Sequence, residues 1–153
     1  MKILLAVDDS QPSYEAAAVV SEWFPADSTV VALHVGSSVP TAAVAAPVAA
    51  SGFGYPAVAL PLLRSERQRI YRDAREVAER AAAIAHGDAR TEAGDPAQKI
   101  TEVASEIDAD LIVIGTGDRS WLSRVITPSV SDEVVHTAPC PVLVVRPDTS
   151  DDT

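Results

Sequence analysis

The sequence predicts an α/β domain, a doubly wound parallel sheet with helices on both faces. Five short apolar runs alternate with segments of helical periodicity, and strands separated by helices form parallel βαβ units. The 153 residues suffice for one domain with a substantial core. Fractions of 47% hydrophobic and 22% charged residues are ordinary for a globular protein. We expect a single domain over residues 1–147 and a disordered acidic tail over 148–153.

The first elements are two strands with a helix between them. The aliphatic run of residues 3–7 is typical of a strand buried on both faces. Ser10 is expected to cap the following helix, and Pro12 suits its first turn. Residues 30–35 predict the second strand. The helix between these two strands has apolar residues at helical spacing, namely Ala16, Ala17, Val20, Trp23 and Phe24.

A long connection precedes the clearest helix of the sequence. Residues 36–63 lack Asp, Glu, Lys and Arg and are rich in Ala, Pro and Ser, which predicts a long flexible connection. Prolines and glycines within it argue against a helix that spans a membrane. Its apolar residues could instead cover a ligand site or pack on a protein partner. The helix is expected over residues 64–86, and Gly87 ends it.

The last third predicts two further βα units and a final strand. Residues 89–93 form a weak third strand, and Asp95 and Gln98 resemble a capping box for the next helix. The fourth strand is expected over 111–114, a helix over 129–137 and the fifth strand over 142–145.

Charge and cysteine content restrict the partners. The net charge of −10 repels nucleic acid, so we expect no nucleic-acid partner. Cys140 is the only cysteine, which excludes an internal disulfide and a cysteine metal site. The histidines have no spacing that suggests metal ligation. With no signal peptide or membrane segment in the sequence, we expect a cytoplasmic protein.

Ligands of such sheets bind beyond the carboxyl ends of the strands, where the strand order reverses. The segments to examine are therefore residues 8–10, 35–37 and 115–118, which follow the first, second and fourth strands.

Motifs along nearly the whole chain resemble those of one family. They are the opening strand and turn at residues 3–10, the Leu33-His34-Val35 strand, Gly94-Asp95-Pro96, and the segments 109–116, 129–131 and 138–145. Together they resemble the universal stress proteins. The resemblance implies a fold like that of the adenine-nucleotide α-hydrolases, with strand order 3-2-1-4-5. It also implies a homodimer, formed in many members through the last strand, here Val142 to Val145.

Many members of this family bind ATP through a glycine motif that admits phosphates to backbone N–H groups. The resemblance places the adenosine part near Asp8 and the backbone of Val35. The remaining candidate pocket residues are Gly115, Thr116, Gly117, Ser129 and Val130.

The phosphate part of the motif is altered here. Asp118 and Pro128 occupy two of the glycine positions. A carboxylate would repel phosphates, and proline has no backbone donor. We therefore expect weak or no ATP binding and no required cofactor, although ATP or another adenine nucleotide remains a possible ligand.

Three of the candidate residues also have a structural interpretation. Asp8 could accept N–H bonds at the start of the helix, Gly115 could permit a tight turn, and Ser129 could simply cap the last helix. No set of nucleophile, base and orienting residue is evident. We expect a stress or regulatory protein that is not an enzyme. The alternatives are a nucleotide-dependent switch, an ATP-cleaving enzyme, or a module whose long connection recruits a protein partner.

Overall fold

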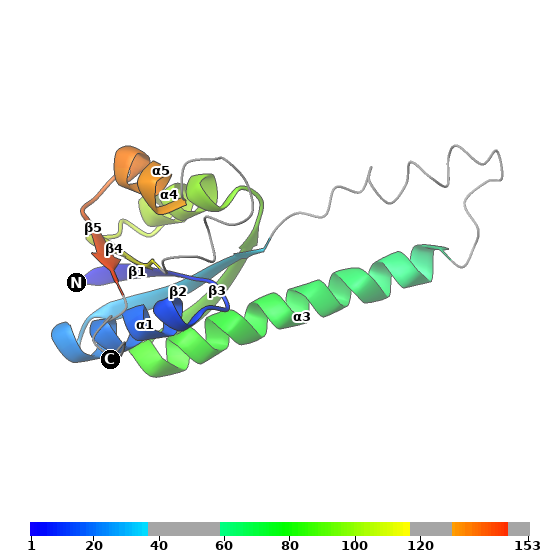
Figure 1. The fold of residues 1–153 in the computed structure, drawn as a ribbon, viewed down its shortest axis with the longest axis horizontal. Helices are drawn as coiled ribbons and strands as arrows, with labels where there is room; N and C mark the ends of the chain where they lie inside the picture. The colour runs from blue at the N-terminus through cyan, green and yellow to red at the C-terminus, as the bar shows by residue number, and fades with distance from the viewer. Residues whose placement is uncertain (37–58, 117–129, 147–153) are drawn as a thin grey trace, which may run out of the picture.

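A five-stranded parallel sheet forms the centre of the molecule (Figure 1). The computed structural model describes residues 1–36, 59–116 and 130–146. The strand order is β3-β2-β1-β4-β5, as the family resemblance implied. The strands are β1 (Lys2–Val7), β2 (Thr29–Gly36), β3 (Asp88–Ala93), β4 (Leu111–Gly115) and β5 (Val142–Val145).

β1 is the central strand, and its register aligns the carboxyl ends of its neighbours. Leu5 pairs with Ala32 of β2 on one side and with Val113 of β4 on the other. Because all pairs are parallel, the residues that follow β1, β2 and β4 come together at one edge of the sheet.

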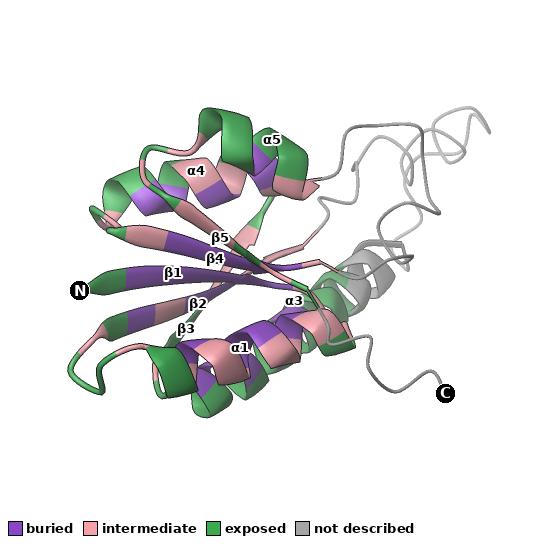
Figure 2. Cartoon of the chain, turned by 60° about the vertical axis from the view of Figure 1, so that its left-hand side comes forward, coloured by how far each residue is buried: buried purple, intermediate pink, exposed green. Residues whose placement is uncertain are grey.

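Two helical layers cover the sheet (Figure 2). The helices α1 (Gln11–Trp23) and α3 (Ala59–Ala85) pack on one face, and α4 (Pro96–Glu106) and α5 (Val130–Thr137) pack on the other. Side chains alternate along β1, so Leu5 joins the α1/α3 core and Leu4 the α4/α5 core. This double burial explains the unbroken aliphatic run of β1.

The predicted buried face of α1 is confirmed except at its end. Ala16, Ala17 and Val20 are buried, but Trp23 is 69% exposed. Trp23 is the last residue of the helix, and Phe24 packs against the core in its place.

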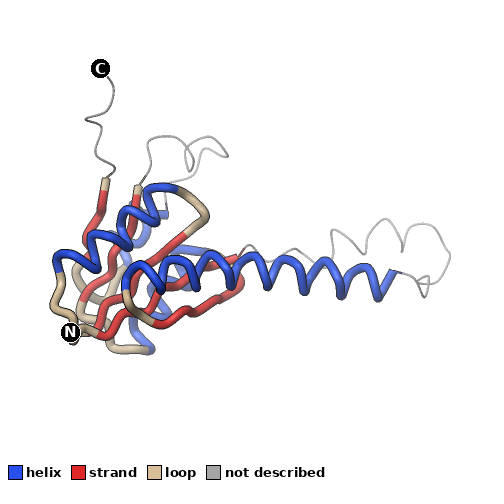
Figure 3. Tube along the Cα trace, turned by 90° about the horizontal axis from the view of Figure 1, so that it is seen from below, coloured by secondary structure: helices blue, strands red, loops and turns tan. Residues whose placement is uncertain are grey.

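α3 begins earlier than the sequence indicated. It starts at Ala59 rather than Arg64, and Gly36 belongs to β2, so the predicted connection over residues 36–63 is too long. Pro61 suggested an irregular segment, but it lies in the first helical turn, where no intrahelical N–H bond is required. The rest of the predicted connection, residues 37–58, and the predicted tail lie outside the described residues. The amino-terminal half of α3 extends well past the sheet (Figures 1 and 3).

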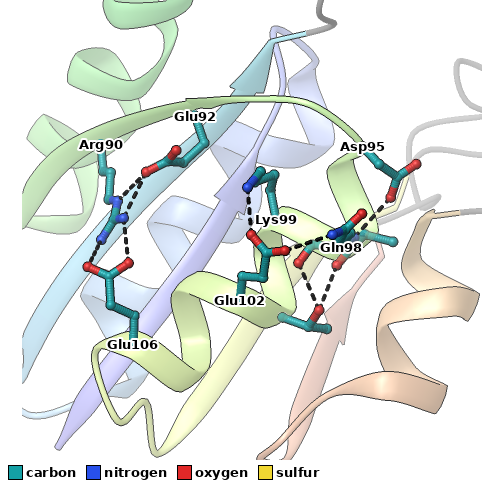
Figure 4. A network of polar contacts seen from close by, with 9 residues as sticks. Arg90, Glu92, Asp95, Gln98, Lys99, Glu102 and Glu106 are labelled. Atoms are coloured by element: carbon teal, nitrogen blue, oxygen red, sulfur yellow. Dashed lines mark hydrogen bonds and ion pairs between the residues drawn. The ribbon is translucent and has the colours of Figure 1, made fainter.

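Ion pairs attach the polar edge strand β3 to α4 (Figure 4). Arg90 Nη2 lies 2.7 Å from both Glu92 Oε1 and Glu106 Oε2. The hydrogen bond from Arg90 holds the pKa of Glu106 below its usual range. At the other end of α4, Asp95 caps the helix by accepting from Gln98 N at 2.9 Å, which confirms half of the predicted capping box. The described helices include none that is both long and apolar enough to cross a membrane.

Candidate functional site

A small pocket lies at the carboxyl ends of β1, β2 and β4, where the strand order reverses. The described residues enclose about 50 Å³ there, whereas ligand pockets usually measure about 300–1,000 Å³. These residues therefore form only the inner end of any site for a nucleotide. The lining is mostly apolar and consists of Ala6, Val7, Asp8, Ser13, Leu33, Val35, Pro96, Ile100, Ile114 and Gly115.

Hydroxyl groups hold the Asp8 carboxylate at the rim of the pocket. Ser13 donates to Asp8 Oδ1 at 2.6 Å, and Ser10 donates to the same oxygen. Ser13 Oγ also accepts from the Asp8 backbone N–H at 3.0 Å. The hydroxyls of Ser10 and Ser13 therefore help to orient the carboxylate.

The prediction that Ser10 caps α1 through its side chain is wrong. Ser10 does occupy the N-cap position with extended backbone angles, but its side chain makes no capping hydrogen bond. The hydroxyl donates to Asp8 instead. Ser13, which the sequence analysis did not single out, is the buried member of this group at 2% exposure. The Ser10-x-x-Ser13 spacing directly after Asp8 is the signal that could have identified it.

Gly115 is required by the packing of α1 on β4. A Cβ atom at residue 115 would lie 2.2 Å from the Pro12 carbonyl oxygen and 2.9 Å from Ser13 N. Gly115 is a buried strand residue, so the expected tight turn is wrong. Its lack of a side chain lets the first turn of α1, with Ser13, approach the pocket.

The other predicted pocket residues are only partly brought together. Val35 lines the pocket with Asp8 and Gly115. Thr116 follows β4, but its backbone N–H donates to Val145 O at 2.8 Å and is committed to the sheet. Val130 packs against the α4/α5 core. Gly117 and Ser129 lie outside the described residues. The same is true of Asp118 and Pro128, which replace glycines of the family motif.

A second polar group lies on the α1/α3 side of the same sheet edge. Tyr14 donates from its hydroxyl to Asp9 at 2.8 Å, and Arg80 stacks 4.7 Å from the centre of the Tyr14 ring. Partial burial and the Asp9 carboxylate raise the pKa of Tyr14 to about 12. These contacts join the turn after β1 to α1 and α3, and sequence spacing gave no sign of them.

The histidine of β2 also contacts the end of the central strand. His34 Nδ1 lies 2.9 Å from Val7 O. Because a carbonyl oxygen only accepts, Nδ1 must carry the proton in this contact. Among the described residues, no three His, Cys, Asp or Glu side chains are placed to hold a metal ion.

Comparisons with known proteins identify the family of this chain. The model of the universal stress protein family matches residues 1–146. Universal stress protein MJ0531 of Methanocaldococcus jannaschii is 32% identical over 149 residues, which cover 95% of this chain and 81% of that protein. The chain belongs to the universal stress protein family.

Other universal stress proteins match over shorter segments. That of Methanothermobacter thermautotrophicus is 51% identical over 53 residues, 35% of this chain and 36% of that protein. The chain is thus matched over about a third of that relative's length.

Solved structures of universal stress proteins share the fold. One is a family protein from Arabidopsis thaliana with AMP bound, with a TM-score of 0.65 and 19% identity over 100% of this chain and 95% of that one. Another is that of Archaeoglobus fulgidus in complex with dAMP, with a TM-score of 0.60 and 21% identity over 95% and 97% of the chains. At these identities the similarity shows the fold of this universal stress protein.

Proposed function

We propose that this universal stress protein is a non-catalytic regulatory protein that receives the adenosine part of an adenine nucleotide beside Asp8. We further propose that it binds AMP or adenosine more tightly than ATP. The observation that carries the proposal is the Asp8 carboxylate, which Ser10 and Ser13 orient at the rim of an apolar pocket.

The chemistry of the pocket suits a nucleoside. Leu33, Ile100 and Ile114 offer apolar surface to the faces of a base, and a carboxylate can accept hydrogen bonds from ribose hydroxyls. Related proteins solved with AMP and with dAMP support an adenine ligand.

The expected preference against ATP comes from the residues that would lie near its phosphate groups. Asp118 and Pro128 replace glycines of the family motif, which places a negative charge and removes a backbone donor in that segment. The Thr116 N–H is already used by Val145. The added carboxylate and the lost backbone donor both weaken the binding of a triphosphate, which needs donors and cations to neutralise its charge.

Calorimetric titration of nucleotide-free protein with AMP, adenosine and Mg-ATP tests this function. We expect AMP to bind at least about tenfold more tightly than ATP, and Asp8→Asn to weaken AMP binding about tenfold or more, since hydrogen bonds to charged groups contribute about 1.5–3 kcal/mol. The matched control is Asp108→Asn, an exposed site whose left-handed backbone (φ 51°) asparagine also tolerates. Tighter binding of ATP than of AMP, or no binding of any adenine ligand, would refute the proposal.

The proposal includes a homodimer that forms along β5. In the described structure β5 pairs with β4 alone. Pro141 O and Val145 O accept from β4 and from the residue that follows it. By alternation, the N–H and C=O of Val144 point away from β4, toward an open edge that another strand can extend. Val144 is also partly exposed, at 36%.

A further inference from the structure

The amino-terminal half of α3 stands away from the body of the protein (Figures 1 and 3). Every described side chain between residues 64 and 73 is exposed, and Ala74 is the first buried one. At 1.5 Å per residue, the helix from Arg64 to Asp73 is about 15 Å long. This part of α3 is therefore a solvent-exposed projection rather than part of a core.

The projection, together with the two residues that follow it, carries a charge opposite to that of the rest of the chain. Residues 64–75, called the basic arm below, have a net charge of +3. Since the whole chain has −10, the remainder carries −13. The arm contains five arginines against Glu66 and Asp73, and these arginines are Arg64, Arg67, Arg69, Arg72 and Arg75.

The arm also has the composition of a protein–protein interface. Two large apolar side chains lie between these arginines in the sequence: Tyr71 is 56% exposed and Ile70 is 38% exposed. Arginine and tyrosine are enriched in interface cores, whereas lysine, absent from the arm, is depleted there.

The carboxyl-terminal end of α1 offers a complementary surface. Trp23 is 69% exposed there, and the neighbouring acidic residues Glu22 and Asp27 are exposed as well. Aromatic rings receive arginine by stacking, and carboxylates receive it by ion pairing.

We propose that the basic arm of one molecule docks on the acidic body of a second copy of this chain, at the surface formed by Glu22, Trp23 and Asp27. The net charge of −13 outside the arm attracts a second arm and repels a polyanion. In a symmetric pair each molecule gives one arm and receives one, so the contact is made twice.

Charge reversal with photo-cross-linking tests this docking. A photo-cross-linking residue replaces Gln68 on the arm, and mixing of ¹⁴N and ¹⁵N chains identifies inter-chain products by mass spectrometry. We expect inter-chain products with peptides of α1. The yield should fall about tenfold or more in R64E/R67E/R72E and in E22K/D27K, because like charges then face each other.

A mixture of the two reversed variants gives the decisive result. The unchanged arm of E22K/D27K then meets the unchanged acidic surface of R64E/R67E/R72E, and the reversed arm meets the reversed positions 22 and 27, so the cross-link should return in the mixture although both variants fail alone. R64K/R67K/R72K is the charge-matched control and should keep a substantial yield. None of these substitutions lies in β5, so the proposed pairing along β5 should contribute equally to all samples.

The docking would be overturned by cross-links within one chain only, by a yield that charge reversal does not change, or by a mixture that stays unlinked while circular dichroism shows full helix content. Binding of fluorescent duplex DNA that R64E/R67E/R72E abolishes, with cross-linking unaffected, would assign the arm to a polyanion and equally refute the proposal.

Discussion

Ser13 contacts Asp8 twice, once at its backbone and once at its side chain. The Ser13 hydroxyl oxygen accepts from Asp8 N at 3.0 Å, and its hydrogen is donated to Asp8 Oδ1 at 2.6 Å. One buried hydroxyl therefore fixes both the turn after β1 and the direction of the carboxylate. The orientation of Asp8 depends on the first turn of α1 as much as on β1.

Replacement of Ser13 by alanine should lower both stability and AMP affinity. It removes two hydrogen bonds at a buried site, which costs about 1–3 kcal/mol in the free energy of unfolding. Urea denaturation measures this cost. The control is Ser105→Ala, an exposed hydroxyl bonded to Thr101 O, which we expect to change stability by about 0.5 kcal/mol at most. Equal stability of the two variants would show that the Ser13 contacts contribute little.

A methyl group at residue 115 should destabilise the protein strongly. In Gly115→Ala the Cβ would lie 2.2 Å from the Pro12 carbonyl oxygen, so α1 must shift. We expect a loss at the upper end of about 1–3 kcal/mol, as in overpacked cores. Gly36→Ala is the control, because its Cβ would meet only Glu92 O at 3.9 Å. Thermal unfolding of both variants decides the point, and similar midpoints would contradict the packing argument.

Tyr14 should ionise only in strongly alkaline solution. Its pKa is raised from 10.0 to about 12 in the folded protein. The folded state therefore binds the Tyr14 proton more tightly than the unfolded state does, and this difference stabilises the fold. That stabilisation is complete below pH 10 and is lost as pH rises toward 12. Tyrosinate absorbance at 295 nm should show a late component that disappears in Tyr14→Phe.

Asp9→Asn should move this late component to lower pH, because the Asp9 carboxylate both accepts from the Tyr14 hydroxyl and repels the tyrosinate. An absorbance titration that Tyr14→Phe leaves unchanged in shape above pH 11 would exclude the assignment.

Proline at residue 144 should prevent pairing along β5 without loss of the fold. The Val144 N–H points away from β4, so its removal leaves the β4–β5 hydrogen bonds intact, and edge strands tolerate proline. We expect sedimentation equilibrium to show a lower mass for Val144→Pro. Val144→Thr keeps the N–H and should keep the mass of the wild type. A Val144→Pro variant of unchanged mass would place the dimer contact elsewhere.

Four of the strands could be predicted because each is a short aliphatic run bounded by polar residues, whereas the polar strand β3 gave only a weak signal. β1 and β4 are buried on both faces, and this leaves an unbroken apolar signal in the sequence. The order of the strands came only with the family resemblance, since local patterns do not specify which strands are neighbours.

The site was predicted less completely because its contacts arise from packing between elements. The position of Asp8 after β1 could be predicted from the sequence, whereas the role of Ser13 depends on how closely α1 approaches β4. The start of α3 was misplaced because Pro61 reads as a break unless its position in the first turn is known.

The close approach of Pro12 to Gly115 bears on how the glycine motif of this family is interpreted. Gly115 is needed for α1 to seat on the sheet whether or not a phosphate ever binds. A variant of this chain that bound no ligand would still need this glycine in order to fold. The presence of Gly115 is therefore not by itself evidence that the chain binds a nucleotide.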